Sequence, residues 1–366
     1  MRIECLKDKL LWAISRCEKI SSKHSTLPVL TCVLFEVKDN VLILKSTNLD
    51  LGIEISLPVK VGEEGMVAIP GLVFSNFIQN LGSNKTVKLE TGEGNLKVST
   101  ENNSTVIKSL PHDDFPTIPS LRGEKGFKMN TKDIVRGLKS VWYSSGTSSM
   151  KPELSSVFVY HDDENIIFVA TDSFRLAEKK IKIKKIPDFN QILIPFKNVI
   201  EIIRVLEDAP DEVEIYSTKN QISFIFEGVY LTSRIVDGVF PDYKQIIPKE
   251  YKTETIVLKQ DLIDSLKLAN VFSDKFNQIN LKLKPSEKSF YLTTRNADVG
   301  ENVNKLESTV SGEDLDINFN YKYIIDCFQS VDPDSVSLQF SGLAKPVVIK
   351  GVGDKSFMYL VMPMNK

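Results

Sequence analysis

The stretch Phe168–Lys180 reads FVATDSFRLAEKK and sets the pattern for the whole chain. The apolar run Ile166–Ala170 predicts a buried strand, and Thr171–Ser173 consists of residues that favour a turn. A second strand is expected over Phe174–Ala177. The stretch therefore predicts a hairpin with one face in a core. An alternative interpretation is that the turn and the second strand frame a surface pocket, through Thr171, Phe174, Arg175 and Leu176.

Two further stretches resemble this hairpin, one in the first third of the chain and one in the last. They are Leu44–Asp50 and Tyr291–Asp298, and aligning Thr47, Thr171 and Thr294 gives steps of 124 and 123 residues. Two sets of helix-like segments and a Phe-Pro pair recur at steps of about 125 residues. Because several independent segments share one step, the sequence indicates three copies of one domain of about 120 residues.

Each copy is expected to be an α+β domain in which two helices pack on antiparallel sheets. The copies are predicted to span residues 1–122, 127–247 and 253–366, separated by linkers rich in proline and glycine. Hydrophobic periodicity predicts the first helix of each copy at Cys5–Lys19, Thr131–Tyr143 and Lys259–Asn270. It predicts the second helix at Gly71–Leu81, Phe196–Glu207 and Tyr321–Val331.

Composition narrows the possible classes of protein. The 366 residues carry 46 basic and 48 acidic side chains, with a formal net charge of −2. A protein that grips DNA only by neutralising phosphates is normally basic, so this balance disfavours a tight independent DNA binder. No apolar run reaches 18 residues and no signal-peptide core begins the chain, so we expect no membrane contact and a cytoplasmic location. We expect reduced, buried thiols at Cys5, Cys17, Cys32 and Cys327.

The motifs of common enzymes and metal sites are missing from the sequence. The three histidines, His24, His112 and His161, lie far apart, and neither CxxC nor HxxxH spacing occurs. The phosphate-binding patterns GxxxxGK[ST] and GxGxxG and the hydrolase pattern GxSxG are also absent. We therefore predict no catalytic residue, no metal and no cofactor. A repeat-built enzyme with an unrecognised site is an alternative.

Several predicted helices carry a basic stripe. Lys132, Arg136 and Lys139 lie about 200° around their helix from the apolar stripe Ile134, Leu138 and Val141. Ordinary solvation is the alternative interpretation of such a stripe. If the three copies form an arc with their helices inside, the stripes line its concave face. Two arcs joined head to tail would close into a ring of twelve helices, which could hold DNA by topology and slide through weak phosphate contacts.

The chain resembles a known family over its whole length, the bacterial sliding clamps, which are the β subunits of replicative DNA polymerase III. The matching stretches are Thr26–Leu30, Ala170–Ala177, Val236–Tyr243, Asn320–Tyr323 and Val361–Met364. The resemblance implies a homodimeric processivity factor, a closed ring that encircles double-stranded DNA without sequence preference. The implied partners are DNA polymerase catalytic subunits, the clamp loader and other proteins that carry a clamp-binding motif.

The resemblance also implies three sets of site residues. A peptide pocket between the central and C-terminal copies would use Leu154, Thr171, Phe174, Arg175, Leu176, Pro241, Ile246, Asn320, Tyr323, Ala344, Pro346, Val361, Met362, Pro363 and Met364. The DNA-facing residues would be Lys9, Arg16, His24, Lys132, Arg136, Lys139, Lys151, Lys197, Arg204, Lys259 and Lys267. The dimer seam would join Val106 and Ile107 of one chain to Val271 and Phe272 of the other.

The sequence departs from the family pattern at a few positions. Phe174 stands where a histidine is common, Gln245 replaces a frequent arginine, and the chain ends in Asn365-Lys366 rather than Arg-Leu.

Two other classes of protein, besides an enzyme, are alternatives to the sliding clamp. An interaction scaffold would explain the repeats without DNA, and a sequence-specific DNA binder would need a base-reading element, which the sequence lacks.

Overall fold

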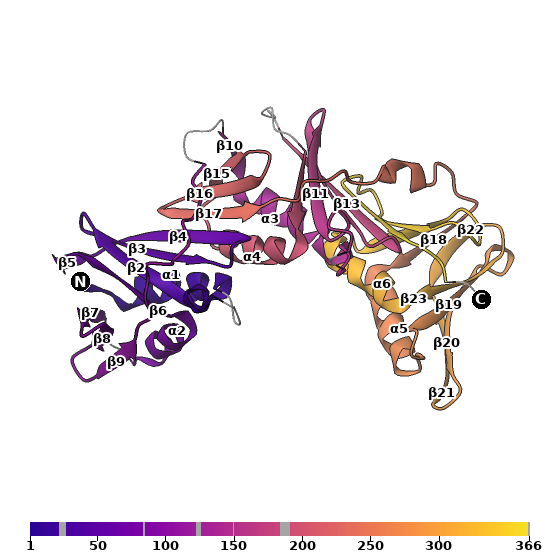
Figure 1. Cartoon of the computed structure of the whole chain (residues 1–366). Helices are drawn as coiled ribbons and strands as arrows, with labels where there is room; N and C mark the ends of the chain where they lie inside the picture. The colour runs from indigo at the N-terminus through magenta and orange to yellow at the C-terminus, as the bar shows by residue number, and fades with distance from the viewer. Residues whose placement is uncertain (22–26, 83–84, 122–125, 149, 184–190, 365–366) are drawn as a thin grey trace. The chain divides into compact units, whose positions relative to one another are not determined.

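The computed structural model describes residues 1–21, 27–82, 85–121, 126–148, 150–183 and 191–364. The chain forms two compact units (Figure 1). The first unit comprises Met1–Ile134 and Ile200–Ile235, and the second comprises Val135–Val199 and Val236–Lys366. The predicted central copy is therefore divided, with part of it in each unit.

The first unit contains two antiparallel sheets and two helices that contact each other, α1 (Lys7–Ile20) and α2 (Gly71–Asn80). The eight-stranded sheet has the order β10-β15-β16-β17-β4-β3-β2-β6, with strands Gly126–Asn130, Glu212–Ser217, Gln221–Phe226, Val229–Arg234, Leu51–Pro58, Val41–Thr47, Cys32–Lys38 and Gly65–Pro70. The five-stranded sheet has the order β5-β1-β7-β8-β9, with strands Lys60–Glu63, Arg2–Leu6, Thr86–Gly92, Asn95–Ser99 and Ser104–Lys108.

The second unit repeats this plan with helices α5 (Lys259–Val271) and α6 (Tyr321–Asp326). Its nine-stranded sheet has the order β14-β11-β12-β13-β26-β25-β24-β18-β22, with strands Ile192–Pro195, Ser156–Asp162, Asn165–Thr171, Arg175–Lys182, Phe357–Val361, Val347–Gly351, Ser335–Phe340, Thr253–Leu258 and Ser308–Gly312. Its four-stranded sheet has the order β21-β20-β19-β23, with strands Gly300–Leu306, Ser289–Asn296, Gln278–Lys284 and Leu315–Asn320. Helices α3 (Thr131–Lys139) and α4 (Phe196–Leu206) each run from one unit into the other.

The predicted hairpin around Phe168–Lys180 is confirmed, because β12 pairs with β13 through a tight turn. The Thr171 hydroxyl donates to the Arg175 carbonyl at 2.7 Å. The Asp172 carboxylate accepts the backbone N–H groups of Phe174 and Arg175, both at 3.0 Å. Ser173 adopts a φ of 78°, in the left-handed region that few residues other than glycine occupy.

The same turn recurs in the first copy, which supports the predicted repeat. The Thr47 hydroxyl donates to the Leu51 carbonyl at 2.9 Å, and Asn48 accepts the N–H groups of Asp50 and Leu51. Leu49 has a φ of 77°, matching Ser173. Because Asn and Asp side chains can both accept these turn hydrogen bonds, the fold is preserved although the residues differ.

The copies are joined in the same way at two places, through antiparallel pairing of their strands. In the first unit, β17 of the central copy pairs with β4 of the N-terminal copy. In the second unit, β26 of the C-terminal copy pairs with β13 of the central copy. Just beyond each pair, one backbone hydrogen bond is repeated, from Arg234 to Asp50 at 2.7 Å and from Met362 to Phe174 at 2.8 Å.

Several predicted helix details are wrong. The predicted helix from Cys5 to Lys19 begins instead at Lys7, because Ile3 and Cys5 point inward with the period of two of strand β1. The sequence also suggests Thr131 as the cap of α3, but Asn130 caps it, since its side chain accepts the N–H of Lys132 at 3.0 Å. The first helix of the central copy ends at Lys139, and a 3-10 turn follows over Trp142–Ser144.

The second helices of the first and last copies depart from a simple pattern, since apolar residues of α2 are partly exposed and α6 is shorter than predicted. In α2, Phe74 and Ile78 are buried, whereas Leu72 and Val73 are exposed. The helix predicted over Tyr321–Val331 becomes a 3-10 helix at Cys327–Ser330. The prediction of buried, unpaired thiols is confirmed for all four cysteines.

Gly137 in α3 gives a stability prediction. A Cβ at this position would lie 2.3 Å from the Phe168 ring, closer than atoms can approach. We expect Gly137→Ala to lower the free energy of unfolding by about 1–3 kcal/mol through overpacking, measured by urea denaturation. Helix propensity alone would raise that free energy by about 1 kcal/mol, so a stabilised variant would contradict this packing argument.

Candidate functional site

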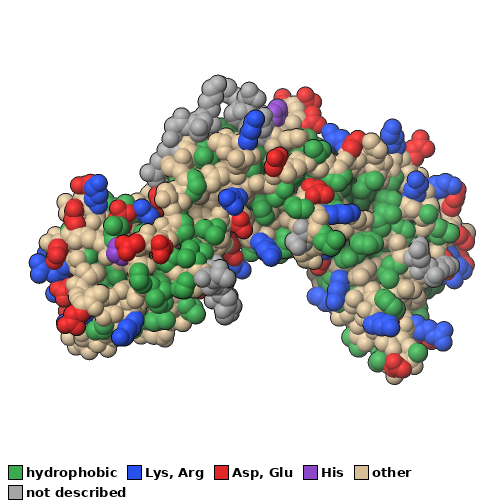
Figure 2. All heavy atoms as spheres, in the orientation of Figure 1, with side chains coloured by type: hydrophobic (Ala, Val, Ile, Leu, Met, Phe, Trp, Pro, Cys, Tyr) green, Lys and Arg blue, Asp and Glu red, His purple; other side chains and the backbone are tan. Residues whose placement is uncertain are grey.

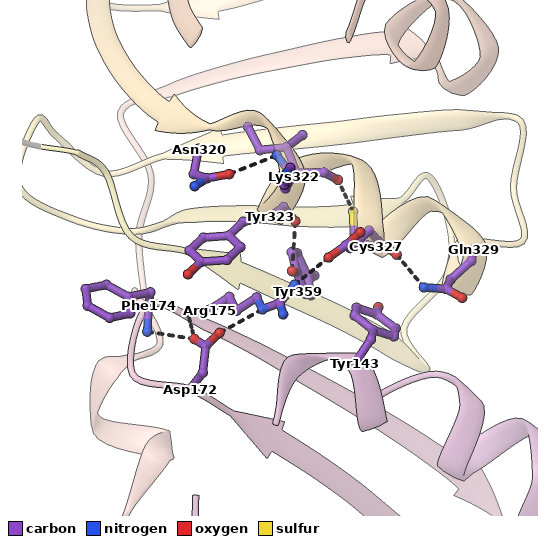
Figure 3. Close-up of polar contacts among 12 residues, drawn as sticks. Tyr143, Asp172, Phe174, Arg175, Asn320, Lys322, Tyr323, Cys327, Gln329 and Tyr359 are labelled. Carbon is purple, nitrogen blue, oxygen red and sulfur yellow. Dashed lines mark hydrogen bonds and ion pairs between the residues drawn. The ribbon is translucent and has the colours of Figure 1, made fainter. Parts of the chain in front are cut away.

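Arg175 lies at the junction of the central and C-terminal copies and is held from both sides (Figure 3). Its guanidinium donates to Asp172 of its own turn at 2.9 Å and to Asp326 of α6 at 2.6 Å. It also stacks over the Tyr323 ring, 4.6 Å from the centroid, where a cation is attracted to the aromatic face. Only 12% of the Arg175 side chain is exposed, so the group is a fixed part of the surface.

A second layer of tyrosines lies beneath Arg175. The Tyr359 hydroxyl donates to the backbone carbonyl of Tyr323 at 2.8 Å. The Tyr143 hydroxyl donates to the Ser330 hydroxyl at 3.1 Å, and Ser330 donates in turn to the Ser140 carbonyl. Burial is the main cause that raises the pKa of both tyrosines. Both therefore stay protonated and act as hydrogen-bond donors, and the bond from Tyr143 to Ser330 ties the central copy to the C-terminal copy.

The residues predicted for the pocket differ in exposure, and we call them together the Phe174 surface. Its exposed members are Phe174, Pro241, Ile246 and Ala344. Its half-buried members are Leu154, Arg175, Asn320, Tyr323, Met362, Pro363 and Met364. Its buried members, which form a floor rather than an accessible face, are Thr171, Leu176, Pro346 and Val361.

The Phe174 surface is apolar with a polar edge. Phe174 is 59% exposed and Ile246 is 50% exposed, values that are high for large hydrophobic side chains. Leu343, which the sequence prediction omitted, is 62% exposed beside Ala344. Figure 2 shows hydrophobic side chains gathered on the part of this unit where Figure 1 draws β13 and β18. An exposed apolar patch rimmed by polar groups is typical of a protein-binding site.

Several of the cations predicted to face DNA are paired with carboxylates. The pairs within the first unit are Arg16–Asp208, Lys132–Asp211 and Arg204–Glu201. The pairs within the second unit are Arg136–Asp332 and Lys267–Asp264. These contacts lower the net positive charge that the stripes present, which agrees with the slightly acidic chain.

Two of these predicted cations are less available than expected. The Arg16 side chain is only 12% exposed and stacks on Trp12, so it serves packing as much as surface charge. The Lys259 ammonium donates to the Val331 carbonyl at 2.8 Å. Lys9, Lys139, Lys151 and Lys197 are exposed, and His24 lies outside the described residues.

The predicted seam residues divide into accessible and inaccessible ones. Val106 and Val271 are 62% and 64% exposed, and Phe272 is half-buried. Ile107 is only 5% exposed, because alternate side chains of β9 point into the core of the first copy. The Ile107 side chain is therefore occupied within its own copy, and the predicted seam would use the backbone of this edge strand there.

The described residues contain no group of three or more His, Cys, Asp or Glu side chains placed to hold a metal ion. Within the same part of the chain, no helix is long and apolar enough to cross a membrane.

The fold and the site together define a class of protein. Repeated α+β copies, strand pairing between copies and an apolar patch at a junction are the features of a repeat-built binding protein.

Comparison with known families identifies this class more closely. Three family models match, the N-terminal, central and C-terminal domains of the DNA polymerase III beta subunit, at residues 1–119, 128–242 and 244–365. The chain therefore belongs to the family of DNA polymerase III beta subunits, the beta sliding clamps. It is a non-catalytic processivity factor of a DNA polymerase, of a family that binds DNA, forms homodimers and interacts with polymerases and other clamp-binding proteins.

Individual relatives cover the chain almost completely. The beta sliding clamp of Staphylococcus aureus is 26% identical over 375 residues, spanning 100% of this chain and 99% of that relative. The solved beta subunit of Thermotoga maritima is 25% identical with a TM-score of 0.94, covering 100% and 99% of the two chains. A sliding clamp from Bartonella birtlesii, solved bound to griselimycin, is 25% identical with a TM-score of 0.94 and full coverage of both chains.

Proposed function

We propose that two copies of this chain close head to tail into a ring that encircles duplex DNA, and that the Phe174 surface tethers DNA polymerases and the clamp loader to it. The observation that carries the ring is the strand pairing repeated at the two junctions within the chain. The proposal assigns the three copies to residues 1–122, 127–247 and 253–366, and the protein to the cytoplasm, where bacterial DNA is replicated.

The repeat leaves two strands without their expected partner. At each junction, the last strand of one copy pairs with the strand that follows the Thr-containing turn of the copy before it. Strand β9 is the last strand of the N-terminal copy, and β21 is the strand that follows the turn of the C-terminal copy. Each of them lies at the edge of its sheet. Pairing β9 of one chain with β21 of the other would give the third kind of junction and close the ring.

The expected register follows from the junctions within the chain. Thr232 lies opposite Gly52, and Leu360 lies opposite Leu176. Asn302 pairs with Thr294 as Gly52 pairs with Thr47 and Leu176 pairs with Thr171, so these three residues occupy one position of the repeat. Val106 lies three residues after Asn103, which closes the β8–β9 turn, as Thr232 lies three residues after Val229, which closes the β16–β17 turn. The proposed seam therefore sets Val106 of one chain opposite Asn302 of the other.

Helix positions support the same seam. Ser140 and Tyr143 of the central copy are buried and hydrogen-bonded to the C-terminal copy through Ser330. The equivalent residues of α5 are Leu268 and Val271, which are 55% and 64% exposed. At the junction within the chain, the neighbouring copy covers these two helix positions. Exposed apolar side chains at the same positions of α5 indicate a surface that a second chain would cover.

The family resemblance implies a docking peptide of the Gln-x-x-Leu-Phe kind, and the apolar Phe174 surface suits its two apolar anchors. Burying two such anchors contributes roughly 1.5–3 kcal/mol each, and the cost of ordering the peptide offsets part of this. The expected affinity is weak to moderate, which suits partners that must exchange. The paired cations described above would likewise make contact with DNA weak, which suits sliding.

Retention on circular DNA tests the ring. After loading by a clamp loader, the protein is expected to stay on closed circular DNA through gel filtration at high salt, because a topological link resists screening. Cutting the circle once should release it, since the ring then slides off the ends. Equal loss from circular and linear DNA would contradict encirclement and would favour an interaction scaffold.

A further inference from the structure

The segment Phe240–Ile247 links the central and C-terminal copies and crosses the nine-stranded sheet of the second unit. Phe240 and Tyr243 are buried against the sheet, in one apolar cluster with Leu176 and Leu360. The 3-10 turn Tyr243–Ile246 then exposes Ile246, a member of the Phe174 surface, and we call this turn the wall of that surface. The position of Ile246 therefore depends on how Tyr243 is held.

Tyr243 is held by a buried carboxylate. Its hydroxyl donates to Glu178 of β13 at 2.5 Å, and Glu178 is only 5% exposed. The hydroxyl of Tyr160 lies 2.7 Å from that of Tyr243. An ionised carboxylate can only accept, so the Tyr243 proton points to Glu178, and the Tyr243 oxygen accepts from Tyr160. The Lys180 ammonium, 3.3 Å away, balances the charge of Glu178.

Aromatic packing fixes the start of the same segment. The rings of Phe158 and Phe240 stack with centroids 4.8 Å apart, and Phe158 stacks on Tyr160 at 4.9 Å. The Tyr243 ring meets Phe240 edge-on at 6.2 Å. These contacts hold the ring of Tyr243 but are not directional at its hydroxyl end, which leaves the hydrogen bonds with Glu178 and Tyr160 to fix that end of the side chain.

We propose that Tyr243 and Glu178 act together as positioning residues for peptide docking, by fixing the wall that carries Ile246. The inference rests on the proposed function of the Phe174 surface. Neither residue needs to touch the peptide, because Tyr243 is buried below the surface and Glu178 lies beneath it on β13. Losing the hydrogen bond between Tyr243 and Glu178 would make the turn that carries Ile246 less rigid, without removing any apolar contact area.

Four variants of the full chain separate this role from general stability. Tyr243→Phe removes the donor, and Glu178→Leu removes the acceptor while filling the apolar site. Glu178→Gln is the conservative variant, because its amide oxygen still accepts from Tyr243. Tyr216→Phe is the matched control, since Tyr216 donates to Glu214 at 3.0 Å in the other unit.

The experiment titrates a labelled Gln-Leu-Ser-Leu-Phe peptide by fluorescence anisotropy and measures urea unfolding in parallel. We expect Tyr243→Phe and Glu178→Leu each to weaken peptide binding about three- to tenfold, the size of one lost hydrogen bond. The double variant should bind like Tyr243→Phe, because losing the Tyr243 hydroxyl already breaks the contact with Glu178. Glu178→Gln and Tyr216→Phe should stay within about twofold of the wild type.

Wild-type affinity in Tyr243→Phe and Glu178→Leu would overturn the inference and leave the docking function intact. Additive losses in the double variant would also overturn it, since the two residues would then act separately. Failure of the wild type to bind up to millimolar peptide would overturn the docking function and this inference together. If Tyr243→Phe fails to fold, Glu178→Leu decides the question, because a leucine suits the surrounding apolar cluster.

Discussion

Ile246→Asp is expected to weaken binding of the Gln-Leu-Ser-Leu-Phe peptide by at least about tenfold, because a charge replaces an apolar side chain that the peptide would cover. Ile246 is 50% exposed in the unbound chain, so the change costs little folding energy and acts mainly on the complex. Fluorescence anisotropy of the labelled peptide measures the loss directly.

The control for this variant is Met150→Asp. Met150 is 90% exposed in the same unit and is not part of the Phe174 surface, so this variant should bind like the wild type. Leu176→Asp is a poorer test, because Leu176 is 1% exposed and its replacement would disrupt the core. Unchanged peptide affinity in Ile246→Asp would place docking elsewhere on the chain.

Val271→Asp is expected to convert the dimer to monomers at micromolar concentration. In a closed ring the variant would bury one unpaired carboxylate at each of two seams, and each costs several kcal/mol. Val271 is 64% exposed in the single chain, so the monomer should keep its stability. Sedimentation velocity distinguishes the two states.

Val239→Asp provides the matched control for the seam. Val239 is 81% exposed in the second unit and lies in the linker, outside the proposed seam. Phe272→Asp is expected to give monomers too, but Phe272 is half-buried beside Gly300, so that variant also strains its own copy. A Val271→Asp protein that sediments as a dimer would remove α5 from the seam.

The repeat and the hairpins could be predicted from sequence because their signals are local. A strand–turn–strand pattern needs only a period of two and turn-forming residues such as Thr171–Ser173. Strand β1 was missed because Arg2–Leu6 is short and runs directly into α1. The buried face of α2 was missed because apolar residues surround this helix, and only tertiary packing selects Phe74 and Ile78 over Leu72 and Val73.

The contacts that organise the candidate site could not be predicted in the same way. The ion pair between Arg175 and Asp326 joins residues 151 positions apart, and neither lies in a motif that specifies the other. The hydrogen bond between Tyr243 and Glu178 is of the same kind. The family resemblance named residues for the pocket, but the exposure of each side chain in the folded chain is needed to tell the exposed residues from the buried ones.

Cross-linking across the seam tests the ring most directly. The four native cysteines are buried, so Val106→Cys and Asn302→Cys together would supply the accessible thiols. A short bifunctional maleimide should then join two chains into a covalent dimer in high yield, whereas either cysteine alone should leave single chains. Single chains from the double variant, under conditions where the protein sediments as a dimer, would contradict the pairing of β9 with β21.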